Sequence, residues 1–143
     1  NEILYKEYEL DDAEIAIISF GVAGRICSSA LRTAREEGVK VGMIRPITLA
    51  PFPTEAIREL SKRVRRILVV EMNTGQMLND VKQAVGGNVP IEFYGRIGGI
   101  TPLPDEILEE IHRVNQNTED IADGQEKVQW LERLEARIER GDQ

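Results

Sequence analysis

Two glycines in this 143-residue chain stand where a ligand phosphate could bind. The segment Gly21-Val22-Ala23-Gly24 lies between an apolar run and a helical pattern, and bare N–H groups at a helix start can bind phosphate. A dinucleotide fingerprint, however, needs G-x-G-x-x-G and an acidic residue at the end of the next strand. The chain has only G-x-x-G, and Arg45 occupies the acidic position. A tight turn with close helix packing is therefore the alternative to an anion or nucleotide site.

Polar side chains also mark the ends of three predicted strands. Arg45, Glu71 and Arg96 lie at or just beyond these ends, and ligands of open α/β sheets bind along the carboxyl edge. Two arginines beside one glutamate could bind an anion or a partner's carboxylate, or could form an internal ion pair that orders the loops. Asn73 and Gln76 are neutral and suit docking against another domain. We predict all five as interface residues, and no catalytic, cofactor-binding or metal-binding residue.

Acid–base and nucleophilic chemistry has little support in the sequence. His112 lies beside an apolar stripe near a predicted helix end, and Ser28 has no neighbouring base to activate it. Cys27 falls on an apolar helix face, where a packed thiol is expected. One cysteine cannot form an internal disulfide or bind an iron–sulfur cluster, and one cysteine with one histidine cannot make a structural zinc site. We expect a reducing, cytoplasmic setting.

The elements that must position these residues alternate along the chain. Short apolar runs predict strands at residues 13–20, 40–45, 66–72 and 90–94. Apolar residues at helical spacing follow each run, and Gly38 is placed to end the first helix. Such alternation predicts a parallel sheet with helices on both faces. Residues 4–10 fit either an edge strand or an interdomain linker.

Charge is unevenly distributed. The net charge is −7, and the whole excess lies in residues 105–143, which suits solubility or a basic partner. An acidic chain without a basic stripe is a poor nucleic-acid binder, and no apolar run reaches the roughly 18–20 residues of a membrane span. The sequence starts without an initiator methionine or a leader, so we expect a piece of a longer chain.

The last segment carries its own pattern. Val128, Leu131, Leu134 and Ile138 form one stripe of a predicted helix at about residues 125–140. Like charges four residues apart on its flanks oppose an isolated helix, so it needs a surface, either on its own domain or on a partner subunit. We divide the chain into a linker or edge strand (1–12), an α/β domain (13–115) and an acidic loop with a C-terminal amphipathic helix (116–143).

Three stretches, taken together and in order, carry a family resemblance. They are Arg-Pro-Ile-Thr-Leu-Ala-Pro-Phe-Pro at residues 45–53, Val-Val-Glu-Met-Asn-Thr-Gly-Gln at residues 69–76, and Gly-Arg-Ile-Gly-Gly-Ile-Thr-Pro at residues 95–102. Residues 13–115 with these motifs resemble the C-terminal domain of the alpha subunit of 2-oxoacid:ferredoxin oxidoreductases, and the 2-oxoglutarate type is the most similar. The resemblance implies a fold like the C-terminal domain of transketolase: a three-layer α/β/α sandwich with a mostly parallel sheet, often with an antiparallel edge strand.

The resemblance also implies a reaction. The parent complex would carry out CoA-dependent oxidative decarboxylation of a 2-oxoacid, 2-oxoglutarate in the most similar type, and pass electrons to ferredoxin. Thiamine diphosphate, magnesium and iron–sulfur clusters would lie in other domains or subunits, with none bound by this domain. The expected neighbours are the beta subunit and the N-terminal domain of the alpha subunit, and a homo-oligomer is possible. The domain would be a non-catalytic scaffold that is inactive alone.

Two alternatives of other classes stay open at this stage. One is a free-standing domain that binds an anion or a nucleotide. The other is the equivalent domain of another thiamine enzyme, such as a transketolase-like synthase or a dehydrogenase beta chain.

Overall fold

The computed structural model describes residues 3–72, 76–96, 102 and 104–141, which form a sheet of five strands with helices around it. The elements are, in chain order, β1 (Tyr5–Tyr8), β2 (Ile15–Ser19), α1 (Gly21–Glu36), β3 (Val41–Pro46), α2 (Thr54–Ser61), β4 (Arg66–Glu71), α3 (Gln76–Val85), β5 (Ile91–Gly95), α4 (Pro104–Gln116) and α5 (Glu126–Glu139). The predicted alternation of strands and helices is confirmed, with ends that differ by a few residues.

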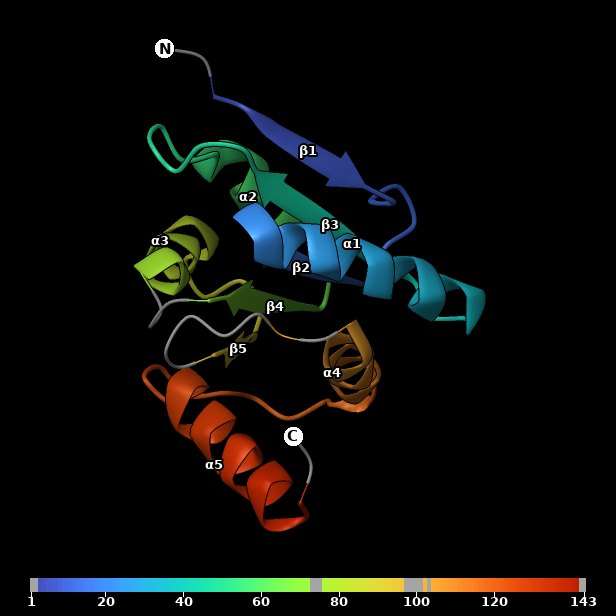
Figure 1. Ribbon diagram of the computed structural model, residues 1–143. Coiled ribbons are helices and arrows are strands. Elements are labelled where there is room, and N and C mark those ends of the chain that lie inside the picture. Colours follow the sequence, from blue (N-terminus) through green and yellow to red (C-terminus); the bar gives the residue numbers. More distant parts are fainter. Residues whose placement is uncertain (1–2, 73–75, 97–101, 103, 142–143) are drawn as a thin grey trace.

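The sheet has the strand order β1-β3-β2-β4-β5 (Figure 1). Strands β2 to β5 run parallel to their neighbours, while β1 pairs with β3 in the antiparallel sense and places Tyr5 opposite Pro46. Residues 4–10 therefore contain an edge strand, which decides between the two possibilities that the sequence left open. The prediction of a mostly parallel sheet is confirmed.

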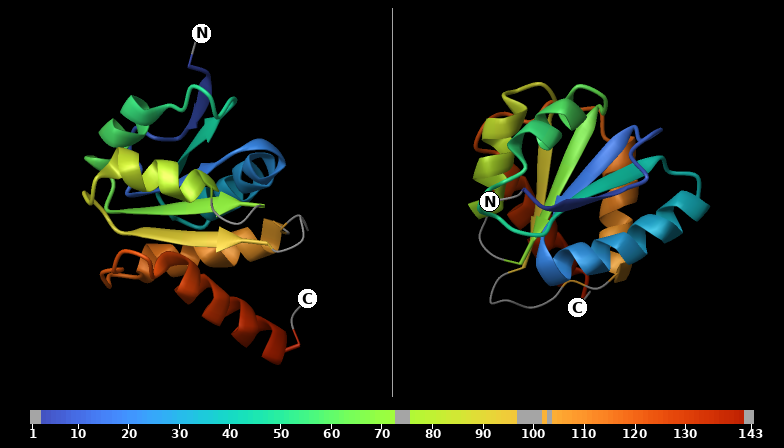
Figure 2. Two further views of the ribbon diagram at one scale, coloured as in Figure 1. Left: turned by 90° about the vertical axis from the view of Figure 1, so that its left-hand side faces the viewer. Right: turned by 90° about the horizontal axis from the view of Figure 1, so that it is seen from above.

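Helices cover both faces of the sheet. Helices α1 and α4 lie on one face and α2 and α3 on the other, as the view from above shows (Figure 2). Every residue of β2 and β4 is buried, because these central strands are covered from both sides. Gly38, with φ of 92°, follows α1 and allows the chain to turn back into β3. These layers form the predicted three-layer sandwich, and none of the helices in the described ranges could cross a membrane.

Helix α5 lies along β5 at one edge of the sheet (Figure 2). Its Trp130 is buried and meets Phe93 of β5 edge to face, with ring centroids 5.2 Å apart. Arg133 adds a hydrogen bond of 2.7 Å from Nη2 to the Phe93 carbonyl oxygen. The final helix thus packs on its own domain, and it covers an edge strand that would otherwise expose unpaired backbone groups.

A chain of ion pairs ties α4 and α5 to the sheet. The Glu92 carboxylate, 1% exposed, accepts from Arg66 Nε at 2.6 Å and from Arg113 Nη1 at 2.5 Å. Arg113 reaches on to Glu110 Oε1 at 2.9 Å, and the same oxygen accepts from Arg133 Nη2 at 3.1 Å. One continuous series of charges therefore runs from β4 through β5 and α4 to α5.

The ionisation of Glu92 is coupled to this network. Burial opposes the charged carboxylate, but the hydrogen bond from Arg66 and the charge of Arg113 outweigh burial and hold the pKa of Glu92 below its ordinary value of 4.5. Since the pKa is lower in the folded state, the stabilisation is fully present above about pH 4.5 and is lost as the pH falls through the folded-state pKa.

We predict that Trp130→Ala lowers the free energy of unfolding by about 3–5 kcal/mol, because it leaves a cavity against Phe93. Ile138→Ala, on the same helix at a side chain that is 62% exposed, should change it by less than about 0.5 kcal/mol. Urea unfolding followed by circular dichroism measures both values. Equal effects of the two substitutions would contradict the packing of α5 on β5.

We further predict that Glu92→Gln lowers the free energy of unfolding at pH 7 by about 3–5 kcal/mol, because it leaves the buried Arg66 guanidinium without its counter-charge. Between about pH 5 and pH 3 the wild type should lose stability more steeply than the variant, which lacks the titrating group. Urea unfolding at several pH values checks this. Parallel pH profiles for the two proteins would show that Glu92 does not carry the acid sensitivity.

Candidate functional site

The carboxyl ends of the parallel strands meet at one edge of the sheet, which we call the rim. Four of the five residues predicted as interface residues can be placed there: Arg45 in β3, Glu71 at the end of β4, Gln76 at the start of α3, and Arg96 just after β5. Gln76 is exposed, Arg45 and Arg96 are partly buried, and Glu71 is buried. Asn73 lies outside the described residues. The topology therefore gathers these residues at one edge, as parallel strands require.

Glu71 has an internal role at this rim. Its Oε1 accepts from the backbone N–H of Met77 at 3.3 Å, and its Oε2 accepts from that of Leu78 at 2.9 Å. These are otherwise unpaired donors of the first turn of α3, so the carboxylate caps that helix. Burial raises the pKa of Glu71 although both N–H donors favour the charged form. The carboxylate is thus used within the domain.

Arg96 is paired with the helix that follows it. Its guanidinium forms an ion pair with Glu106 of α4, and the Tyr94 hydroxyl donates to the same carboxylate. Neither arginine pairs with Glu71 among the described residues, so the interpretation of Arg45, Glu71 and Arg96 as one ion pair was wrong. Glu71 thus holds the start of α3, and Glu106 joins α4 to the end of β5, which the sequence did not reveal.

Arg45 crosses the start of α1. A Cβ on Gly24 would come within 2.9–3.0 Å of the Arg45 side-chain atoms Cγ, Cδ and Nε, so only glycine leaves room for this crossing. The glycine pair thus serves close packing, which was the alternative to a phosphate site. Among the described residues, the buried Arg45 Nε has no acceptor, and no side chain caps the start of α1 at Phe20. Arg45 therefore keeps an unused hydrogen-bond donor at the rim.

Exposed apolar side chains are concentrated at the rim, where β1 begins and β2 and β3 end. The described residues include ten large apolar side chains that are exposed, and seven of them form the rim patch: Ile3, Leu4, Tyr5, Phe20, Val22, Ile47 and Leu49. They lie at the ends of neighbouring strands, and the Ile47 N–H donates to the Leu4 carbonyl oxygen at 2.9 Å. The remaining three lie on α5. The sequence analysis did not predict the rim patch, although the apolar residues directly after the strands at 15–19 and 41–46 indicate an apolar surface there.

The side chains that could act as nucleophiles or bases are buried or hydrogen-bonded within the domain. Cys27 is fully buried, and burial raises the pKa of its thiol to about 12 although Ser19 hydrogen-bonds to it. His112 Nε2 lies 2.6 Å from Glu37 Oε1, which joins α4 to the end of α1. The Ser28 hydroxyl donates to the Arg25 carbonyl oxygen within its own helix. These contacts agree with the absence of a catalytic role that the sequence predicts, but they do not test it.

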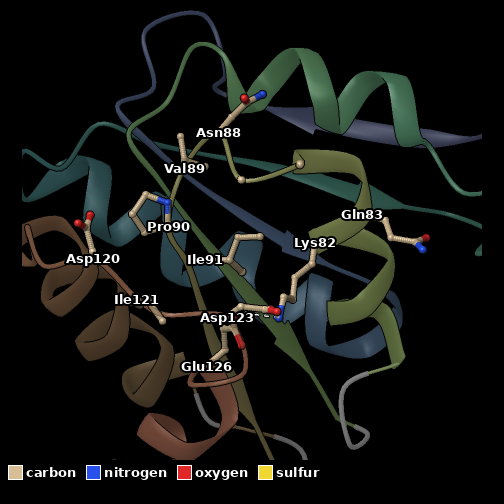
Figure 3. A pocket seen from close by; sticks show the side chains of 12 residues that line it. Lys82, Gln83, Asn88, Val89, Pro90, Ile91, Asp120, Ile121, Asp123 and Glu126 are labelled. Carbon is tan, nitrogen blue, oxygen red and sulfur yellow. Dashed lines mark hydrogen bonds and ion pairs between the residues drawn. The ribbon is translucent and has the colours of Figure 1, made fainter.

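A cavity of about 600 Å³ lies at the opposite, amino edge of the sheet (Figure 3). It is walled by the Gly86–Ile91 connection from α3 to β5 and by the segment before α5. Lys82 enters from α3 and pairs with Asp123 and, at 3.1 Å, with Glu126. Both carboxylates thus pair with the one ammonium group that lines the cavity, and Asp120 is a third carboxylate in its lining.

Comparisons with known proteins match this fold to one family. The model of the family "Pyruvate:ferredoxin oxidoreductase core domain II" matches residues 13–107. Ketoisovalerate oxidoreductase subunit VorB of Methanothermobacter thermautotrophicus is 43% identical over 120 residues, which cover 84% of this chain and 34% of that protein. 2-Oxoglutarate synthase subunit KorA of Methanothermobacter marburgensis is 45% identical over 101 residues, or 71% of this chain and 27% of that protein. The chain thus spans about a third of the length of the curated relatives it matches.

Solved structures agree on the fold. A 2-oxoglutarate:ferredoxin oxidoreductase from Magnetococcus marinus superposes with a TM-score of 0.66 at 21% identity, covering 79% of this chain and 20% of the other. A split-gene transketolase superposes with a TM-score of 0.63 at 11% identity, covering 80% of this chain and 42% of the other. The resemblance read from the sequence motifs and the predicted fold class are both confirmed. The sandwich, the motifs at its rim and the family match lead to one conclusion: this chain belongs to the pyruvate:ferredoxin oxidoreductase core domain II family.

Proposed function

We propose that the chain is a non-catalytic assembly domain of a 2-oxoacid:ferredoxin oxidoreductase alpha subunit. The whole protein would catalyse CoA-dependent oxidative decarboxylation of a 2-oxoacid and pass the electrons to ferredoxin. The observation that carries the proposal is the rim patch, a set of exposed apolar side chains where β1 begins and β2 and β3 end, on a domain that covers only a third of its relatives. Two relatives bear the names of different 2-oxoacids, which supports the substrate class. Within this class, 2-oxoglutarate stays our expectation.

The metal-ligating side chains of this chain do not fit the iron–sulfur clusters or the magnesium ion of such a reaction. One cysteine cannot bind an iron–sulfur cluster, and within the described ranges no three His, Cys, Asp or Glu residues are grouped as a magnesium or iron site would need. The proposal therefore places the clusters, and the magnesium that binds with thiamine diphosphate, in other domains or subunits. No step of the reaction is assigned to a residue of this chain, and a cytoplasmic setting stays a prediction.

The rim patch suits a docking surface in its chemistry. Soluble proteins seldom expose contiguous apolar groups, and those that do use them for binding. Arginines within apolar surfaces are typical of interface hot spots, and Arg45 is a partly exposed arginine at this edge. Arg45, Asn73, Gln76 and Arg96 keep their proposed interface role, and Glu71 supports them by fixing the start of α3. We propose the beta subunit and the N-terminal domain of the alpha subunit as the neighbours.

We predict that Leu49→Glu in the full-length protein shifts the assembled complex toward smaller species and lowers turnover in parallel, because a carboxylate would be buried without a partner. Leu131→Glu on α5 is the matched control, since both leucines are 40% exposed. Sedimentation velocity and turnover measure the effects, and thermal unfolding shows that both variants stay folded. An intact and active Leu49→Glu complex would contradict the proposed docking surface.

We also predict that Arg45→Ala weakens subunit association about tenfold, because the partner then loses a charge-assisted hydrogen bond. Arg58→Ala on α2, whose guanidinium pairs with Glu55 on the surface, should leave association unchanged. Concentration-dependent sedimentation gives both association constants. If the two variants associate equally well, Arg45 contributes only to packing against α1.

A further inference from the structure

Strand β1 contributes less buried surface than any other strand of the sheet. It lies at the outer edge and, among the described strands, pairs only with β3 (Figure 1). Three of its four residues are exposed, whereas every residue of β2, β4 and β5 is buried. Segments that bury few apolar contacts open locally at a low free energy, so β1 is the strand that separates most readily from the sheet.

The chain leaves β1 through a residue in an unfavourable backbone conformation. Glu9 has φ of 52°, in the left-handed region that residues with a side chain rarely adopt. Leu10, the next residue, is buried and lies against Gly42 of β3, where an added Cβ would come within 2.6 Å of Leu10 Cδ2 and 2.8 Å of the Glu9 carbonyl oxygen. Because Leu10 is fixed in the core, Glu9 is the hinge about which β1 would swing away, and opening would relieve its strained φ.

One guanidinium group holds this hinge. Arg35, at the end of α1, donates from Nη2 to the Glu9 carbonyl oxygen at 2.7 Å and from Nε to the Val41 carbonyl oxygen of β3 at 2.9 Å. It also pairs at 2.8 Å with Asp12, in the connection between β1 and β2. The Asp12 side chain is 57% exposed, so water screens that pair, and the two carbonyl contacts are the stronger restraint. Arg35 therefore joins the end of β1 to the start of β3.

The other end of β1 lies at the rim. Ile3, Leu4 and Tyr5, at and just before the start of β1, are three of the seven side chains of the rim patch. The hydrogen bond between the Ile47 N–H and the Leu4 carbonyl oxygen holds this end beside β3. If β1 left the sheet, these three side chains would leave the patch with it. Attachment of β1 and completeness of the patch are thus one event, although Arg35 lies at the opposite, amino edge.

We propose that residues 3–8 form a strap that opens and closes about Glu9, that Arg35 holds it closed, and that docking at the rim requires the closed form. The closed form presents seven apolar side chains and the open form presents four. Relief of the Glu9 conformation favours opening and the Arg35 contacts favour closure, so a change at Arg35 shifts the population between the two forms. This regulation rests on the proposed docking function, in which Arg35 is a positioning residue.

Hydrogen exchange of the full-length protein, read by mass spectrometry, tests the strap. A bond from a charged donor to a carbonyl oxygen changes an equilibrium by about ten- to a hundredfold. Arg35→Ala loses two such bonds and should speed the exchange of residues 3–8 by about a hundredfold or more, while β4, at residues 66–71, exchanges as in the wild type. Arg35→Lys should have an intermediate effect, because an ammonium group lacks the fork that reaches Glu9 and Val41 together.

Arg58→Ala on α2 is the matched control, because its guanidinium pairs with Glu55 on the surface, and it should leave the exchange of the strap unchanged. The proposal is overturned if Arg35→Ala leaves the exchange of residues 3–8 as it is in the wild type. It is also overturned if β4 accelerates to the same degree, because Arg35 would then stabilise the domain as a whole.

Concentration-dependent sedimentation of the same variants tests the link to docking. The apparent association constant falls in proportion to the closed fraction, so a strap that is closed about one tenth of the time should weaken association about tenfold. If Arg35→Ala opens the strap but keeps wild-type association while Leu49→Glu loses it, the docking function stands and its regulation by the strap is wrong. If both variants keep wild-type association, the docking function itself is wrong and the regulation falls with it.

Discussion

A buried carboxylate on β5 determines how one side of this domain is built. Glu92 lies inside the sandwich, where an unpaired charge would be strongly unfavourable, so it must meet cations from elsewhere in the chain. Arg66 comes from the neighbouring strand and Arg113 from α4. Arg113 also pairs with Glu110, which in turn pairs with Arg133 of α5. These ion pairs join both C-terminal helices to the sheet, in addition to the apolar contacts of α4 and of Trp130. Since α5 then covers the free edge of β5, that side of the sheet is closed to other chains.

The proposed docking role falls to the rim. Both sheet faces are covered by helices, and among the described residues most of the large exposed apolar side chains lie at the rim end of β1, β2 and β3. Residues with catalytic potential are held in packing or surface contacts, as the buried Cys27 thiol illustrates. In the function proposed above, the domain presents this apolar edge to its neighbours, while the chemistry takes place in other parts of the enzyme.

The sequence predicted the layers well because local patterns determine them. Apolar runs and helical spacing located β2 to β5 and the helices after them, and the motifs at the strand ends identified the family. Residues 4–10 stayed undecided because an edge strand with the alternating polarity of LYKEYEL resembles a linker. The predicted apolar stripe of α5 was wrong as the packing face: Val128, Leu131 and Ile138 are exposed, and Trp130 beside the stripe packs against Phe93 instead.

The partners of individual charges could not be predicted in the same way. Arg45, Glu71 and Arg96 were correctly placed at one edge, but which carboxylate each arginine meets depends on how helices return across it. Nothing in the sequence marks Glu92 within the strand predicted at residues 90–94, and only the three-dimensional structure shows its pairing with Arg66 and Arg113. The rim patch was missed for another reason: exposed apolar residues are ordinary one by one, and only the three-dimensional structure shows that they are neighbours.

The most direct test of the docking role is hydroxyl-radical footprinting of the assembled full-length enzyme, read by mass spectrometry at single residues. Tyr5, Phe20 and Leu49 of the rim patch are 37%, 37% and 40% exposed in the domain, as is Leu131 of α5 at 40%. If the rim meets a neighbouring domain or subunit, the three rim residues react several-fold more slowly in the assembly than their exposure here implies, while Leu131 reacts as its exposure implies. Rim residues that react as readily as Leu131 would show an open edge and contradict the docking role.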